Sequence, residues 1–152
     1  MRNKLVLASI VAVVVIGSVL GYSWLSVITP GNTPQVSQSS SCVTPPGYFL
    51  IVADLHGFND SVGHLHAVPD EPWPVINVKR GDRVNIIVCN QDDYSPHGFA
   101  IQNYFDRGIA IMPHESFRIS IVADQAGTFT IYCNIFCPEH AYMQSGQLVV
   151  AE

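Results

Sequence analysis

The sequence predicts an all-β domain, built as an antiparallel sandwich or barrel, behind an apolar N-terminal segment. From residue 48 onward, short apolar runs alternate with turn residues at the spacing expected for the strands of such a fold. Residues 116–123 alternate most clearly, with Phe117, Ile119 and Ile121 on one face and Arg118 and Ser120 on the other. Beyond residue 28 there is no apolar stripe with a period of 3.6 residues over three turns, so strands are expected throughout the domain.

The first 28 residues are expected to form a membrane anchor. Arg2 and Lys4 precede 24 uncharged residues, Leu5 to Ile28. At about 1.5 Å per residue this run is long enough to cross a hydrocarbon core of roughly 30 Å. A cleaved secretory signal is the alternative, although the run ends without an Ala-x-Ala-like site. The basic residues place the N-terminus in the cytoplasm, so we expect a single-pass plasma-membrane protein whose domain is periplasmic or extracellular.

After the anchor, the chain is expected to divide into a linker and one domain. Residues 29–47 are rich in Pro, Ser, Thr and Gln and carry no charge, which is typical of a flexible linker. The domain takes up residues 48–152. Its expected strands are residues 48–54, 73–79, 83–90, 97–102, 108–112, 116–123, 127–133 and 147–150. The loop of residues 56–72 is long and irregular, and such loops are either functional or mobile.

Side chains that bind metals gather near the C-terminus. Within eleven residues, the run from Cys133 to Met143 (CNIFCPEHAYM) contains the thiols of Cys133 and Cys137, the imidazole of His140 and the thioether of Met143. A second imidazole, His97, starts another expected strand. Soft sulfur together with imidazole is a donor set that copper prefers, whereas calcium, magnesium and manganese favour oxygen. The run lies between two strands, which could fix the donors with or without metal.

Other chemistries remain open for the same residues. Two cysteines four apart in an oxidising compartment could form a disulfide. A tetrahedral zinc ion could bind Cys133, Cys137, His97 and His140, although this would leave Met143 unused. Copper could bind as one ion or as two.

Four blocks of the chain resemble a known family. They are residues 78–84 (VKRGDRV), 95–99 (SPHGF), 127–133 (GTFTIYC) and the loop onward to Met143. Across residues 74–150 the chain is similar to the cupredoxin domain of subunit II of haem–copper oxygen reductases, in its short form with one membrane span. The resemblance implies a Greek-key β-sandwich that houses a dinuclear copper A centre.

The resemblance also implies a ligand set and a role. Cys133 and Cys137 would bridge two copper ions, His97 and Met143 would complete one ion, and His140 and the carbonyl of Ile135 would complete the other. The chain would then be the electron-entry subunit of a respiratory terminal oxidase of the cytochrome c oxidase type. It would accept electrons from cytochrome c or a small blue copper protein and pass them to haem in subunit I. The enzyme activity would belong to the complex.

One spacing departs from this pattern. The family has three residues between the second cysteine and the histidine, whereas here Cys137 and His140 are separated by two. The Cys-x-x-His-x-x-Met spacing resembles that of amicyanin, so the alternative is a membrane-anchored carrier with one type 1 blue copper. Cys133 favours two ions, since it stands six residues after Gly127, where either family places its first thiolate.

The net charge of the outer part of the chain indicates which partners it could attract. With Arg2 and Lys4 set aside, 5 basic residues remain against 12 acidic ones, which gives the outer part a net charge near −7. Such a field could steer a basic redox partner, and ordinary solubility is the alternative reason for it. No nucleic-acid partner is expected.

The remaining candidates are weaker. Cys89 is interpreted as a buried apolar side chain, and a Cys42–Cys89 disulfide is a further hypothesis. Tyr132 and Phe136 are expected to form a dry wall around the metal. The other histidines are expected to be solvated, and Trp73 is expected to pack under the long loop, with donor docking as its alternative. Those histidines are His56, His64, His66 and His114.

Overall fold

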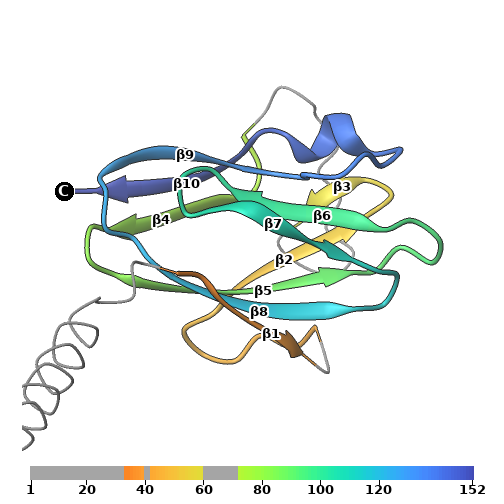
Figure 1. Cartoon of the computed structure of the whole chain (residues 1–152), viewed down its shortest axis with the longest axis horizontal. Helices are drawn as coiled ribbons and strands as arrows, with labels where there is room; N and C mark the ends of the chain where they lie inside the picture. Colours follow the sequence, from red (N-terminus) through yellow and green to blue (C-terminus); the bar gives the residue numbers. More distant parts are fainter. Residues whose placement is uncertain (1–32, 40–41, 60–71) are drawn as a thin grey trace, which may run out of the picture. The chain divides into compact units, whose positions relative to one another are not determined.

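The computed structural model describes residues 33–39, 42–59 and 72–152, which form two five-stranded sheets packed face to face (Figure 1). The first sheet contains, in spatial order, β1 (Gln35–Ser39), β8 (Ser116–Val122), β5 (Arg83–Asn90), β2 (Phe49–Asp54) and β3 (Gly57–Asn59). The second contains β4 (Val75–Lys79), β10 (Gly146–Ala151), β9 (Gly127–Tyr132), β6 (His97–Ile101) and β7 (Phe105–Ile111). A short 3-10 helix, η1 (His140–Met143), precedes β10. The all-β expectation is thus confirmed for the described part of the chain.

The proposed membrane anchor, residues 1–28, lies outside the described residues. Within the described ranges, no helix has the length and apolar character needed to span a bilayer.

The pairing of strands is mixed rather than purely antiparallel. β2 runs parallel to β5, and β4 runs parallel to β10, while the other pairings are antiparallel. The tight turn at Gly81 and Asp82 carries the chain from β4 in the second sheet to β5 in the first. Strands β4 and β5 therefore follow one another in sequence but enter different sheets, and each of them pairs in parallel with a strand from elsewhere in the chain.

Two strands arise from segments that were expected to be irregular. β1, inside the expected linker, pairs with β8 along its whole length, from Gln35 opposite Ser120 to Ser39 opposite Ser116. The disulfide between Cys42 and Cys89 ties the following residues to β5, which confirms that hypothesis. β3, inside the expected long loop, pairs with β2. Part of the linker therefore belongs to the sandwich.

The core fills the space between the sheets and continues into the C-terminal loop. The alternation in β8 buries Ile119 and Ile121 completely or nearly so, whereas Phe117 is only half-buried. Burial of a large apolar side chain contributes about 1.5–3 kcal/mol. The same buried cluster includes Cys133, Cys137 and Met143. The sulfur donors therefore lie at the end of the core, where water is excluded.

Candidate metal centre

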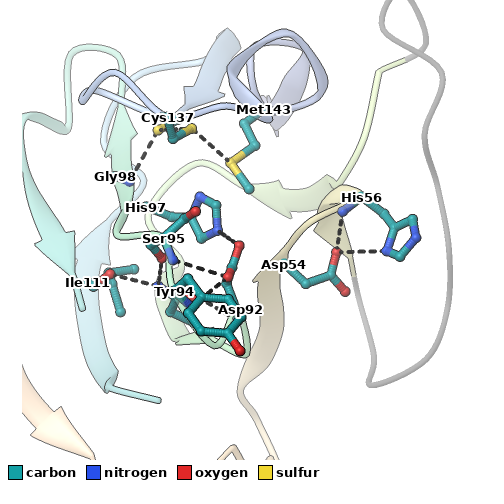
Figure 2. Close-up of polar contacts among 12 residues, drawn as sticks. Asp54, His56, Asp92, Tyr94, Ser95, His97, Gly98, Ile111, Cys137 and Met143 are labelled. Atoms are coloured by element: carbon teal, nitrogen blue, oxygen red, sulfur yellow. Dashed lines mark hydrogen bonds and ion pairs between the residues drawn. The ribbon is translucent and has the colours of Figure 1, made fainter. Parts of the chain in front are cut away.

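The two thiols lie beside each other at the end of β9. The Sγ atoms of Cys133 and Cys137 are 3.5 Å apart, and both cysteines are free and buried. The amide of Gly98, on the adjacent strand β6, donates a hydrogen bond to Cys133 Sγ at 3.1 Å (Figure 2). The alternative of a Cys133–Cys137 disulfide is therefore not formed in this structure.

Gly98 allows the loop of residues 133–143, which we call the ligand loop, to approach β6. A Cβ atom at this position would lie 2.7 Å from the amide nitrogen of Asn134 and 2.8 Å from that of Ile135. No real side chain tolerates such contacts, so the loop between the cysteines packs here only because residue 98 is glycine. The side chain of Asn134 then donates a hydrogen bond to the carbonyl of Arg107, at 2.9 Å. The loop is thus held against β6 and β7.

His140 and the carbonyl of Ile135 lie on one side of the thiol pair. The Ile135 oxygen is 3.1 Å from Cys133 Sγ and 3.1 Å from Nδ1 of His140. Gln144 donates to the carbonyl of Cys133 at 3.0 Å, and its amide nitrogen is also 3.4 Å from the same ring nitrogen. The structure therefore brings together three of the predicted donors: the Cys133 thiol, the Ile135 carbonyl and the His140 ring.

Met143 closes the site from another side. Its side chain is fully buried, and its Sδ atom lies 3.9 Å from Cys137 Sγ (Figure 2). The carbonyl of Met143 accepts a hydrogen bond from the amide of Cys133 at 2.8 Å. This bond joins the two ends of the ligand loop, so the loop has a defined shape without metal.

His97 offers one free nitrogen to the site. Its side chain is fully buried, and Nε2 lies 3.3 Å from Oδ2 of Asp92 (Figure 2). Burial by itself would raise the pKa of Asp92, but hydrogen bonds from the amides of Tyr94 and Ser95 and from His97 outweigh burial and lower it. An ionised Asp92 accepts a hydrogen bond from the Nε2–H group, which leaves Nδ1 as the nitrogen with the free lone pair. Nδ1 is buried and has no hydrogen-bond partner, as expected of a metal ligand.

The loop that carries Asp92 is itself supported from β5. The side-chain amide of Asn90 donates to the carbonyls of Ser95 and Ile111 at 2.8 and 2.9 Å, and its oxygen accepts the amide of Asp92 at 2.8 Å. Asn90 is almost fully buried. Asn90 therefore orients Asp92, and Asp92 orients His97.

The donor atoms form two groups that share one thiol. The ligand atoms of Cys133, Cys137 and His140 lie within 4.8 Å of one another, and so do those of His97, Cys137 and Glu139. The four donors of the zinc alternative do not all lie within that distance of one another, so the structure does not favour a single tetrahedral zinc site. Two thiols, two imidazoles, a thioether and a carbonyl are a donor set that fits copper.

Cys137 is a thiol in the metal-free protein. Burial, the hydrogen bond and the charge of the neighbouring Cys133, and the charge of Glu139 together raise the pKa of Cys137 to about 12. The amide of Glu139 hydrogen-bonds to the same sulfur and opposes this shift. A cation that binds here at neutral pH must therefore displace a proton from Cys137.

Part of this domain is similar in sequence to nitrous-oxide reductases. The chain is 38% identical over 77 residues to the nitrous-oxide reductase of Ralstonia nicotianae and 32% identical over 75 residues to that of Stutzerimonas stutzeri. These matches cover 49% and 48% of this chain but only 12% of each relative. No protein-family model matches the chain.

Solved structures share the fold. A chain of a haem-copper terminal oxidase dimer is similar over 98% of this chain and 97% of its own length, with a TM-score of 0.52 and 18% identity. Copper nitrite reductase from Nitrosomonas europaea is similar over 75% of this chain and 52% of its own, with a TM-score of 0.54 and 10% identity. The domain is an all-β cupredoxin-like sandwich. The domain shares its fold with these solved structures, and the donor set at the end of its core fits copper.

The structure also places an aromatic residue and several histidines that lie outside the ligand set. Phe136 does not form a dry wall: it is 94% exposed and stacks on the ring of His140 at a centroid distance of 6.4 Å. His56 contacts Asp54, and His114 contacts Asp93, in ion-pair geometry at 3.5 and 3.4 Å. Among the described residues, neither histidine belongs to a group of metal-binding side chains. His64 and His66 lie outside the described residues, and Trp73 is half-buried.

Sequence reasoning missed Asp92 and Glu139. Asp92 precedes His97 by five residues within a run of turn residues, and a carboxylate at this distance gives no recognisable pattern. Glu139 is one of the two residues between Cys137 and His140, and its spacing alone does not mark it as a donor. The shortened spacing was a usable signal, since a loop that lacks one residue must place its remaining side chains differently.

Proposed function

We propose that this chain is the electron-entry subunit of a respiratory haem–copper terminal oxidase, with a dinuclear copper A centre. The observation that carries the proposal is the pair of free, buried thiols 3.5 Å apart, with Ile135 and His140 on one side and His97 and Met143 on the other. The likeness to a haem-copper terminal oxidase chain over almost the whole length of both supports this context.

The residues of this chain would do three things for electron transfer. Cys133 and Cys137 would bridge the two ions, so that one electron is shared over both metals and both sulfurs. Bound copper would supply the one-electron chemistry. The short loop closed by the Cys133–Met143 hydrogen bond would keep the donors in place when the charge changes. Burial of both thiols and Met143 would exclude water from the centre.

The partners and the location are part of the proposal. A donor such as cytochrome c or a small blue copper protein would deliver electrons at the ligand loop, and haem in a catalytic subunit I would receive them. Residues 1–28 would anchor the chain in the plasma membrane with the copper domain outside the cytoplasm.

The decisive experiment measures the number of copper ions per chain and identifies the subunits that purify with it. The full chain, purified in detergent after expression with ample copper, is expected to contain two copper ions and to be purple. Isolation from native membranes is expected to bring a haem-bearing subunit with it. A single zinc ion, or a Cys133–Cys137 disulfide in the folded chain, would contradict the proposal.

A second candidate is an anchored carrier with one blue copper ion. The observation that favours it is the two-residue spacing between Cys137 and His140. It predicts one copper per chain, an intense blue colour and no haem partner, so the same preparation distinguishes the two candidates.

A further inference from the structure

Glu139 directs a carboxylate toward the donors of the site. One of its oxygens lies within 4.8 Å of a ring nitrogen of His97 and of Cys137 Sγ, which themselves lie within that distance of each other. The amide of Glu139 hydrogen-bonds to the Cys137 sulfur, so its backbone is fixed at the site as well. Glu139 is one of only two residues in the shortened Cys137–His140 spacing, and this position brings it to the metal centre.

Two buried polar atoms in this group lack partners. Glu139 Oε2 has no hydrogen-bond partner, and neither does Nδ1 of the fully buried His97. No Lys or Arg side chain in the described part of the chain forms an ion pair with Glu139. Glu139 as a whole is half-buried, but buried polar atoms such as its Oε2 are almost always satisfied in native proteins. A cation between these atoms would satisfy both.

We propose that Glu139 supplies a carboxylate oxygen to the metal ion held by His97 and Cys137. This inference rests on the proposed copper function and adds a ligand to it. Glu139 would join Met143 on this side of the centre, since Met143 Sδ also lies close to Cys137, at 3.9 Å.

The chemistry of the added donor differs from that of the thioether. A carboxylate is a hard, anionic ligand, whereas a thioether is soft and neutral. The oxygen would stabilise the more oxidised state of the centre and lower its reduction potential. It would also bind the ion on the His97 side more tightly than the thioether alone.

Three variants of the full chain distinguish ligation of the metal by Glu139 from an effect of its negative charge alone. Glu139→Gln keeps the size of the side chain but removes its charge. Glu139→Asp keeps the charge but withdraws the carboxylate by one methylene. Glu152→Gln is the control, since Glu152 pairs with the exposed Arg80 at the far end of β10 from the ligand loop (Figure 1). Each variant is loaded with copper in detergent, and copper release to a chelator, the electron paramagnetic resonance spectrum and the reduction potential are measured.

If Glu139 is a ligand, the Gln and Asp variants should behave alike. Both should release one of two copper ions roughly ten-fold faster or more, change the resonance spectrum and raise the potential. Glu152→Gln should match the wild type in all three measurements.

Two outcomes would overturn the inference alone. If Glu139→Asp matches the wild type while Glu139→Gln shifts the potential, Glu139 acts only through its charge. If both variants match the wild type, Glu139 does not act on the metal at all. In either case a wild-type chain with two coppers would leave the proposed function intact. A wild-type chain that binds no copper would overturn both.

Discussion

The four cysteines form two pairs with opposite chemistry in one domain. Cys42 and Cys89 are joined in a disulfide, whereas Cys133 and Cys137 remain free thiols with sulfurs 3.5 Å apart. An oxidising compartment favours disulfides in general, so the compartment alone does not decide which pair is joined.

The surroundings of the two pairs explain the difference. Cys89 is buried on β5 next to Asn90 and is not part of any group of metal-binding side chains in the described ranges. Cys133 has the Gly98 amide and the Ile135 carbonyl beside its sulfur, and it is grouped with His140. A thiol with several metal donors around it can be used by a metal, while one without them serves to link two segments. The first pair therefore links two segments of the fold, whereas the second lies among the donors of the proposed site.

Replacement of Cys137 by Ser should have the largest effect. The change removes one of two proposed bridges, so we expect copper to fall from two ions to one per chain and oxidation of the electron donor to stop. Metal analysis, the visible spectrum and single-turnover oxidation of a reduced donor measure this. Full copper content with an unchanged spectrum would show that Cys137 is not a bridge.

The double variant Cys42→Ala, Cys89→Ala should show the reverse of Cys137→Ser: the fold should lose stability while copper stays bound. The disulfide closes a loop with a sequence separation of 47, and its loss should lower the free energy of unfolding by about 2–4 kcal/mol. Copper content should remain at two, because neither cysteine belongs to a group of metal-binding side chains among the described residues. Denaturant unfolding tests the expected loss of stability, and metal analysis of the same preparation tests the copper content. Loss of copper at unchanged stability would mean that the roles of the pairs are assigned wrongly.

Asp92→Asn should weaken the site without removing a ligand. The carboxylate orients the His97 ring through Nε2, and loss of such a partner typically reduces metal affinity 10–100-fold. Copper competition against a chelator measures this change. The matched control is Asp93→Asn, since the side chain of Asp93 is exposed and lies in ion-pair geometry with the exposed His114. Equal effects of the two substitutions would exclude a specific role for Asp92.

Much of the fold could be predicted because its strands carry their own pattern. β8 alternates in sequence and buries Ile119 and Ile121 as expected. β1 (Gln-Val-Ser-Gln-Ser) has no apolar alternation and is almost entirely exposed, so it forms only because it pairs with β8. β3 is three residues long, and the parallel pairings depend on which sheet each strand enters. These features depend on tertiary contacts that a local pattern does not contain.

The site, like the fold, has a part that the sequence predicts and a part that depends on tertiary contacts. Residue type and spacing predict Cys133, Cys137, His140, Met143 and His97 as donors, and the structure brings these side chains close to one another. Asp92 could not be predicted, because its role depends on hydrogen bonds from Tyr94 and Ser95 that turn its carboxylate toward His97. Phe136 was predicted wrongly, since the burial of its neighbours in sequence says little about a side chain in a loop.

Met143→Leu should affect the thiol-pair site less than Cys137→Ser or Asp92→Asn does. The thioether is a weak ligand, so both coppers should stay bound while the reduction potential rises. Leu has a similar volume, and such swaps usually cost less than about 1.5 kcal/mol of stability. Redox titration and metal analysis provide the check. Complete loss of metal would contradict the role of Met143 as a weak ligand.

The last contrast between the pairs is in their titration. Burial and the neighbouring Cys133 raise the pKa of Cys137 from 9.0 to about 12 in the folded, copper-free protein. The folded chain then binds this proton more tightly than the unfolded chain, so its contribution to stability is complete below about pH 9 and is lost as the pH rises toward about 12. The disulfide-bonded cysteines do not titrate.

Denaturant unfolding of the copper-free chain between about pH 8 and about pH 11 should therefore show stability falling with pH. Tyr and Lys side chains also lose protons in this range, so the comparison must be made with Cys137→Ser under the same conditions. The slope should be steeper in the wild type, because only the wild type has the thiol. Equal slopes would mean that the folded protein does not hold the Cys137 proton, and that copper enters the site without displacing it.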